Sequence, residues 1–472
     1  MRASIKNGLL NLKKTQFYSQ SRLIIVLFLL FGLCFLPQVR GDESLPLLGE
    51  NAAINIEMEY KIGGRFYRRL LEQGVIETDP ILDGYLDELG ARLLSGIENR
   101  VRDYTFFIVK DFGINAFAVP GGFIGVNIGL ITRAQNQHQL ASVLAHEIAH
   151  VRLMHSLQLM QKSSSVGNAA MLSLLAGLLL GSYDSEIASA LVFGSAAGSQ
   201  QAMINFTREN EYEADRLGMT LLQNGNFDAQ GMVDFFKLMQ RAAGSSEFQN
   251  IEYLRTHPVN ANRISESQNR VKLTAKSRLD PDYFPMFRDY LIYFSFDRLQ
   301  VSGSKFLQAL AQIKTGQFEL ANSALHQLYL KDSENIWYGY AYAENLEYLE
   351  QLDRAELVYR KLLNIYPDEF ALSLRLMRLL KSAGKFEAAL TIARRLEKRF
   401  SEKKSVYIEL SEIYQELNRP VFRMMAEAEF HKLAGNPTQA IKLYNTVIDS
   451  SEVDLATESR ARAKLAEIKD RN

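Results

Sequence analysis

Hydrophobic and polar residues alternate in patterns that change along the chain. Residues 53–100 carry apolar side chains at helical spacing, which predicts α-helix. Tyr104–Asp111 and Ala116–Ile131 are instead rich in Phe, Val and Ile, and the second segment contains the turn Pro120-Gly121-Gly122. These two segments predict short β-strands, with a tight turn inside the second.

A longer helix is predicted after these strands. Asn136 with Gln139 three residues later is a capping-box pattern, so the helix should begin near Gln137. Residues 169–198 are then strongly apolar, in two runs of about a dozen residues, each shorter than the roughly 20 that span a bilayer. Two interpretations stay open for them. They form a buried helical hairpin, or a hairpin that covers a site or contacts a membrane surface peripherally.

From about residue 303 the pattern becomes one of helix pairs with an internal period. Gly316–Ala321, Glu350–Ala355 and Gly384–Ala389 repeat every 34 residues in one register. This is the tetratricopeptide period, in which stacked helix pairs bury a continuous core, whereas the alternative is an unrelated helical bundle. A similar segment, Gly435–Ala440, comes 51 residues after the third, so the register is irregular or a non-standard pair lies near Pro420.

The predicted fold class is therefore α+β, mostly α, with a small β-sheet and then an α-solenoid of tetratricopeptide-type repeats. The predicted units are residues 1–41, 42–300 and 303–472, with the second boundary between Phe284 and Ser304.

Composition changes this picture mainly at the N-terminus. Lys plus Arg and Asp plus Glu both number 54, so net charge does not favour nucleic acid as a partner. A basic start precedes the apolar run Leu23–Leu36, which is too short to span a bilayer and is ended by Pro37. We predict a cleaved signal peptide over residues 1–41, with a retained anchor as the alternative. The only cysteine, Cys34, lies in this run, so the cleaved chain would fold without disulfides.

The segment from His146 to His150 reads His-Glu-Ile-Ala-His, an HExxH motif within the predicted helix. Residues four apart lie on one helix face, so both imidazoles can bind one ion beside Glu147. Zinc suits nitrogen ligands and lowers the pKa of a water, whose proton Glu147 would accept and pass to the leaving amine. The alternative is an amphipathic helix with two hydrogen-bonded histidines, whose burial without partners would be costly.

His155 lies close to this motif but is not predicted to be a ligand. The metzincin pattern requires Gly and His three and six residues after the second histidine, where this chain has Leu153 and Ser156. A helix also turns by about 140° between His150 and His155. We therefore predict a surface or helix-end position for His155.

A second helical segment, Arg208–Gly218, supplies carboxylates. Glu211 and Asp215 are four residues apart, so both lie on one helix face. Glu211 could bind the ion, and Asp215 could accept the second N–H of a ligand histidine. On its own, the segment is more typical of a solvated charged helix face.

HExxH followed about sixty residues later by ExxxD within Asn210–Gly218 resembles the gluzincin peptidases that include the CAAX prenyl endopeptidase, metallopeptidase family forty-eight. Asn115–Leu130 also looks like the segment that precedes the zinc helix in that family. The resemblance implies a zincin-like metalloprotease domain over residues 42–300 that binds one Zn2+. It implies that His146, His150 and Glu211 are the zinc ligands and that Glu147 is the general base. It also implies that Asp215 accepts a hydrogen bond from a ligand histidine without touching the metal.

Thr256–Arg263 resembles the downstream His-Pro segment of the same family. The resemblance implies that His257 lies over the metal, where it could act as a self-inhibiting fourth ligand, and that Arg263 lies near the site. From the residues alone, His257 before Pro258 reads as a helix-capping or surface residue.

Substrate capture is predicted on the second β segment. Its glycines suit an exposed edge that another backbone can approach, so a peptide could add there as a further strand. The predicted edge strand consists of Gly122, Phe123, Ile124, Gly125, Val126 and Asn127.

The resemblance also implies a periplasmic enzyme that degrades misfolded or misassembled outer-membrane proteins, whose repeat domain binds clients or the outer-membrane assembly machinery, with a chaperone role besides. The alternative is a non-catalytic repeat scaffold of an envelope assembly complex. A structural zinc is normally enclosed by four ligands, often cysteines, which the cleaved chain lacks. This favours the protease.

Overall fold

The computed structural model describes residues 56–95, 97, 103–156, 158, 197–244, 251–272, 282–297, 303–451 and 453–469. The described chain is mostly helical with one small sheet, in agreement with the α+β class. The expected signal peptide 1–41 and residues 169–196 of the expected hairpin lie outside the described residues. No helix in the described part of the chain is long and apolar enough to cross a membrane.

The sheet contains four short strands in the order β1-β2-β4-β3. Their bounds are Ile76–Glu77 for β1, Thr105–Val109 for β2, Ala116–Val119 for β3 and Phe123–Asn127 for β4. β2 and β4 are parallel, whereas β3 and β4 form an antiparallel hairpin. Its turn requires glycine, because φ is +89° at Gly122 and an added Cβ there would lie 2.2 Å from the carbonyl oxygen of Asp103.

The prediction of an edge strand at Gly122–Asn127 is wrong. β4 pairs with β2 on one side and with β3 on the other, so it lies inside the sheet. Gly125 makes room for aromatic side chains, since an added Cβ would lie 2.6 Å from the ring of Phe117 and 2.8 Å from that of Phe107. Among the described strands, the edges are β1 and β3.

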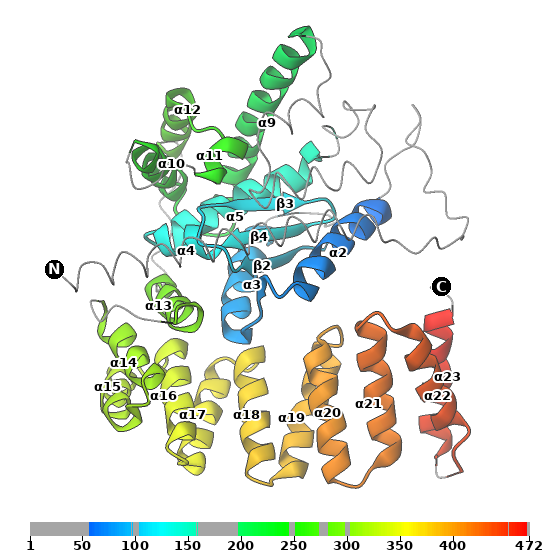
Figure 1. The fold of residues 1–472 in the computed structure, drawn as a ribbon. Coiled ribbons are helices and arrows are strands. Elements are labelled where there is room, and N and C mark those ends of the chain that lie inside the picture. The colour runs from blue at the N-terminus through cyan, green and yellow to red at the C-terminus, as the bar shows by residue number, and fades with distance from the viewer. Residues whose placement is uncertain are drawn as a thin grey trace, which may run out of the picture.

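Helices cover this sheet and carry the candidate site (Figure 1). Their bounds are Ile56–Glu72 for α2, Pro80–Leu94 for α3, Ile128–Arg133 for α4, Gln137–Arg152 for α5, Ala197–Asn224 for α9, Gln230–Ala243 for α10, Glu252–Thr256 for α11, Ala261–Val271 for α12 and Phe284–Ser295 for α13. α5 begins at Gln137 as predicted, and the Asn136 side chain accepts a 3.0 Å hydrogen bond from the backbone N–H of Gln139.

The remaining helices form one row of antiparallel neighbours that begins beneath α13 and α3 and extends beyond them (Figure 1). Their bounds are Lys305–Lys314 for α14, Phe318–Lys331 for α15, Ile336–Tyr348 for α16, Leu352–Ile365 for α17, Phe370–Ser382 for α18, Phe386–Arg399 for α19, Lys404–Glu416 for α20, Pro420–Leu433 for α21, Pro437–Ile448 for α22 and Leu455–Lys469 for α23.

The turns of this row follow the 34-residue period further than the sequence pattern indicated. The chain adopts positive φ at Gly316, Glu350, Gly384 and Asn418, which are 34 residues apart. The expected irregularity near Pro420 is therefore not in the turn before α21. It comes at the next turn, where Gly435 has positive φ only 17 residues after Asn418.

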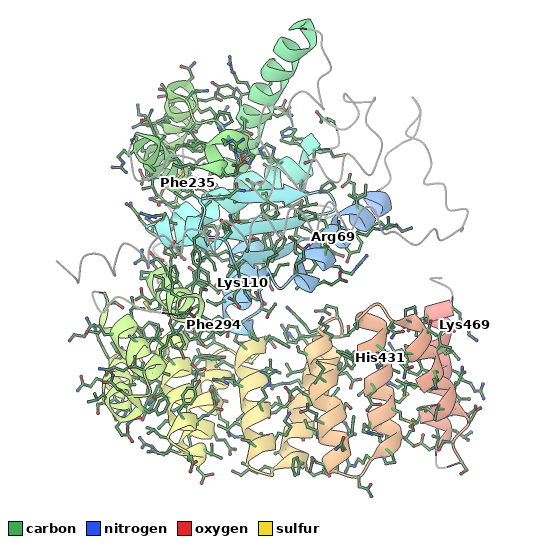
Figure 2. The ribbon with its side chains drawn as sticks, in the orientation of Figure 1. Arg69, Lys110, Phe235, Phe294, His431 and Lys469 are labelled. Carbon is green, nitrogen blue, oxygen red and sulfur yellow. The ribbon has the colours of Figure 1, made fainter. Side chains whose placement is uncertain are left out.

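The sheet-bearing part and the helix row share one hydrophobic core. The Tyr85 ring of α3 stacks on Phe287 of α13 with 4.3 Å between ring centroids, and Phe287 lies 5.9 Å from Trp337 of α16. Figure 2 places Phe294, near the end of α13, at this junction. Because the buried aromatic rings interlock, the helix row also supports the helices that carry the site.

Candidate metal centre

The candidate metal centre starts from two packed helices. α5 presents His146, Glu147 and His150, and α9 presents Glu211. α9 approaches α5 closely at Gly218, where an added Cβ would lie 3.3 Å from the backbone nitrogen of His146. This glycine lets the carboxylates of α9 reach the histidines of α5.

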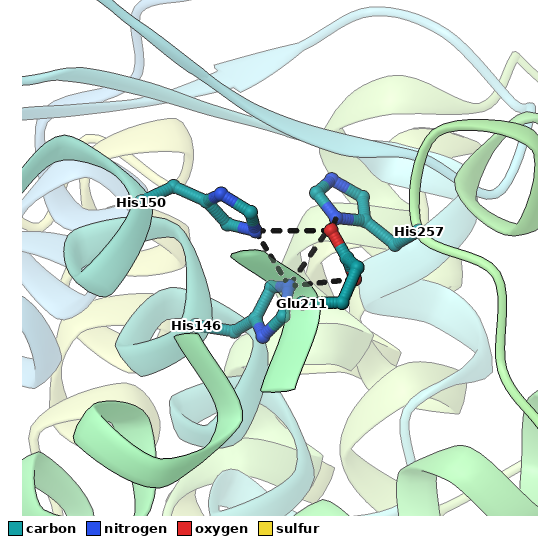
Figure 3. Close-up of side chains that lie close together, drawn as sticks. All are labelled: His146, His150, Glu211 and His257. Atoms are coloured by element: carbon teal, nitrogen blue, oxygen red, sulfur yellow. Dashed lines mark hydrogen bonds and ion pairs between the residues drawn. The ribbon is translucent and has the colours of Figure 1, made fainter. Parts of the chain in front are cut away.

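Four side chains converge at one point (Figure 3). They are His146 and His150 of α5, Glu211 of α9, and His257 at the end of α11. The His146 Nε2 atom lies 2.9 Å from His150 Nε2 and 3.2 Å from His257 Nδ1. Glu211 closes the group, with one carboxylate oxygen 3.3 Å from His150 Nε2 and 3.0 Å from His257 Nδ1.

This donor set fits zinc. Tetrahedral zinc with bonds of about 2.0–2.1 Å to nitrogen or oxygen separates its ligand atoms by about 3.3 Å. The contacts that His146 and Glu211 make with each other and with His150 and His257, at 2.9–3.4 Å, are close to that geometry. All four ligand atoms lie within 4.8 Å of one another. Nitrogen lone pairs this close repel each other unless a proton or a cation lies between them. Three imidazole nitrogens and one carboxylate oxygen are therefore arranged to hold one Zn2+.

The outer nitrogen of His146, Nδ1, is backed by a buried ion pair. His146 Nδ1 lies 3.0 Å from an oxygen of Asp215. Arg263 donates two hydrogen bonds to Asp215, at 2.7 Å and 2.8 Å, and its side chain is only 1% exposed. The same guanidinium lies 2.8 Å from Glu211 and donates to the carbonyl oxygen of Pro258. Arg263 thus connects α12 to two carboxylates of α9, those of Glu211 and Asp215.

Glu147 lies beside the cluster rather than within it. Burial, and to a smaller extent the nearby Glu211 carboxylate, raise the pKa of its carboxyl group, while the electrostatic influence of the neighbouring imidazoles and a hydrogen bond from the backbone N–H of Ala118 lower it. One oxygen of Glu147 lies 3.4 Å from His257 Nε2. The carboxylate therefore lies between the histidine cluster and the edge strand β3, which contains Ala118.

His155 lies just beyond the end of α5, but the prediction of a surface position for it is wrong. Its side chain is only 4% exposed, and its Nδ1 atom lies 2.9 Å from Nδ1 of His150. The helix does not continue to His155, because α5 ends at Arg152 and Met154 has a φ of +56°, which turns the chain back toward His150. His155 is still not one of the four convergent side chains, since it contacts the outer nitrogen of His150.

The comparisons with known proteins agree with this geometry. Residues 80–271 match peptidase family M48. The chain is 29% identical over 458 residues to a relative from Vibrio cholerae, with 92% of this chain and 94% of the relative covered. It is 27% identical over 447 residues to the beta-barrel assembly-enhancing protease of Escherichia coli, with 89% and 90% covered. Over 157 residues it is 29% identical to the mitochondrial metalloendopeptidase OMA1 of Schizosaccharomyces pombe, with 33% and 43% covered.

The site lies within the matched residues, and its donor set is one that holds zinc. The Escherichia coli relative is named as a protease and the Schizosaccharomyces pombe relative as a metalloendopeptidase. Residues 80–271 are therefore a peptidase family M48 domain, and the protein is a zinc metalloendopeptidase.

Proposed function

We propose that the protein is a periplasmic zinc endopeptidase that cleaves unfolded or misassembled outer-membrane proteins. One observation carries the proposal: His146, His150, Glu211 and His257, from separate helices and a loop, converge beside the buried carboxylate of Glu147. The client class is supported by the Escherichia coli relative, which is named beta-barrel assembly-enhancing protease.

His146 and His150 would bind the metal through their Nε2 atoms, and Glu211 would supply the third ligand atom. The zinc supplies Lewis-acid chemistry, because it polarises a peptide carbonyl and makes a water more acidic. Asp215 accepts the Nδ1–H of His146 and so selects the tautomer in which Nε2 is free to bind. Arg263 neutralises Asp215 and keeps its carboxylate oriented.

Glu147 acts as the general base. Its buried carboxylate takes a proton from the attacking water and later passes it to the leaving amine. The hydrogen bond from Ala118 holds this carboxylate against β3. The same strand is an edge of the described sheet, so an extended peptide can pair with its outer side and pass in front of Glu147. The substrate strand is thus β3, rather than the Gly122–Asn127 segment first expected.

The helix row from α14 to α23 has the helix lengths and turn spacing of tetratricopeptide repeats. We assign it the binding of clients or of the outer-membrane assembly machinery, with a chaperone role besides. Residues 169–198 supply the peripheral membrane contact in this proposal, because their apolar runs begin close to the site in sequence.

The test is cleavage of an outer-membrane β-barrel protein diluted from urea, compared with the same protein folded in detergent. We expect the unfolded client to be cut and the folded one to be spared. A chelator should abolish cutting, and stoichiometric zinc should restore it. Cutting that persists after complete removal of the metal would contradict the proposal.

The position of His257 leads to a separate prediction. Its ring bridges the ligand cluster and Glu147, with Nδ1 3.2 Å from His146 Nε2 and Nε2 3.4 Å from Glu147. It therefore occupies the space that an attacking water needs. If the ring leaves this position one tenth of the time, His257→Ala should raise kcat/KM roughly tenfold for a quenched fluorescent peptide.

The matched control for His257→Ala is His431→Ala, which removes a histidine from α21, far from the site (Figure 2). It should leave the rate of peptide cleavage unchanged. A self-inhibiting role of His257 is excluded if His257→Ala retains zinc and cleaves the peptide no faster than the wild type.

A further inference from the structure

We infer that His155 and Glu213 form an outer support that positions His150 for metal binding. The inference rests on the proposed metal centre and adds two residues to it. His155 Nδ1 lies 2.9 Å from His150 Nδ1, and His155 Nε2 lies 3.4 Å from a carboxylate oxygen of Glu213. The three side chains therefore form a chain that leads from the ligand cluster to the outer side of α9.

The local fold brings these residues together although they belong to separate segments. Met154, in the left-handed region with φ +56°, reverses the chain after α5 and returns His155 to the ring of His150. The two rings are 4.9 Å apart and nearly perpendicular, at 75°. Glu213, on α9, approaches from the solvent side, with its side chain 58% exposed.

The direction of the hydrogen bonds follows from the use of Nε2. His150 Nε2 points into the cluster, 3.3 Å from Glu211, so a metal bound there requires that the proton of the neutral ring be on Nδ1. The Nδ1–H group then donates to Nδ1 of His155. His155 in turn carries its own proton on Nε2 and donates it to Glu213. Each ring thus has one donor and one acceptor, and one combination of tautomers satisfies both hydrogen bonds, from His150 to His155 and from His155 to Glu213.

This support complements the one behind His146. The outer nitrogen of His146 faces Asp215, which is buried and neutralised by Arg263. The outer nitrogen of His150 faces an uncharged ring, which an exposed carboxylate holds in place. Both Nε2 ligands are thereby held in the metal-binding tautomer by neighbours that do not touch the metal. Outer partners of this kind typically change metal affinity by about 10–100-fold.

The test measures zinc affinity by competition with a chromophoric chelator, in the absence of any substrate. His155→Leu fills the space without an acceptor and should weaken zinc binding by about 10–100-fold. His155→Asn keeps an acceptor near the position of Nδ1 and should bind zinc within about threefold of the wild type. Glu213→Ala, at an exposed position, should weaken binding by about threefold to tenfold, because water replaces part of the lost contact.

The melting temperature of each metal-free variant separates positioning from folding. A positioning role predicts that His155→Leu loses zinc affinity while its metal-free melting temperature stays close to that of the wild type. The inference is overturned if His155→Leu binds zinc as tightly as the wild type, or if Asn and Leu weaken binding equally. Zinc-binding differences of the expected order without client cleavage would sustain the inference and refute the proposed function instead.

Discussion

Glu147→Gln is expected to lower kcat by about 10²–10⁴-fold while zinc binding is retained. The amide cannot accept the proton of the attacking water, yet its carbonyl oxygen can still accept the hydrogen bond from Ala118. Glu147 is not one of the four convergent side chains, so the metal content should equal that of the wild type. Burial raises the pKa of Glu147 above its usual value, which means that its charged form destabilises the fold. The variant should therefore be at least as stable as the wild type at neutral pH.

The measurement is the steady-state rate of peptide cleavage at saturating zinc, with metal content determined on the same samples. Glu266→Gln serves as the matched control, since Glu266 lies on α12 and pairs with Arg216 at the surface. The control should cleave at the wild-type rate. Glu147 is not the base if Glu147→Gln remains fully active with its zinc bound.

The second large effect is expected on stability. Arg263→Met should lower the free energy of unfolding by about 3–5 kcal/mol, because it leaves the buried carboxylate of Asp215 without its cationic partner. Asp215 is 7% exposed and Arg263 is 1% exposed, so water cannot replace the lost contact. The variant also removes the contact between Arg263 and Glu211. Urea unfolding of the metal-free protein measures the change directly.

Arg216→Met is the control for this experiment. Arg216 is on α9, one residue after Asp215, but its side chain is 51% exposed and pairs with the partly exposed Glu266. Losing that surface pair should cost less than about 1 kcal/mol. Adding Asp215→Asn to Arg263→Met should recover part of the stability, because the unpaired charge is then gone. A change below about 1 kcal/mol for Arg263→Met would show that the pair is not needed.

Much of the candidate site could be predicted because its signals are local. The spacing of His146 and His150, and that of Glu211 and Asp215, places each pair on one face of a helix whatever the rest of the fold does. The capping pattern at Asn136 predicted where α5 begins. The 34-residue period is equally local, since small residues recur at the same position of successive repeats, at Ala321, Ala355 and Ala389.

The errors came from features that depend on distant neighbours. The glycines of β4 suggest an exposed edge, but in the structure Gly125 makes room for Phe107 and Phe117 of the neighbouring strands. Sequence alone does not show on which side a glycine is approached. A surface position for His155 follows only if the helix continues past Met154, but Met154 has positive φ and ends the helical path.

By itself, the sequence determined the helices, the repeat period and the pairing of His146 with His150 and of Glu211 with Asp215, because these follow from spacing along the chain. Only the tertiary structure decided which strand is the edge, how His257 lies between the ligands and Glu147, and that His155 returns to His150. Those outcomes depend on how α5, α9, α11 and the sheet pack against one another. Packing joins residues that are far apart in the chain, and no local pattern encodes it.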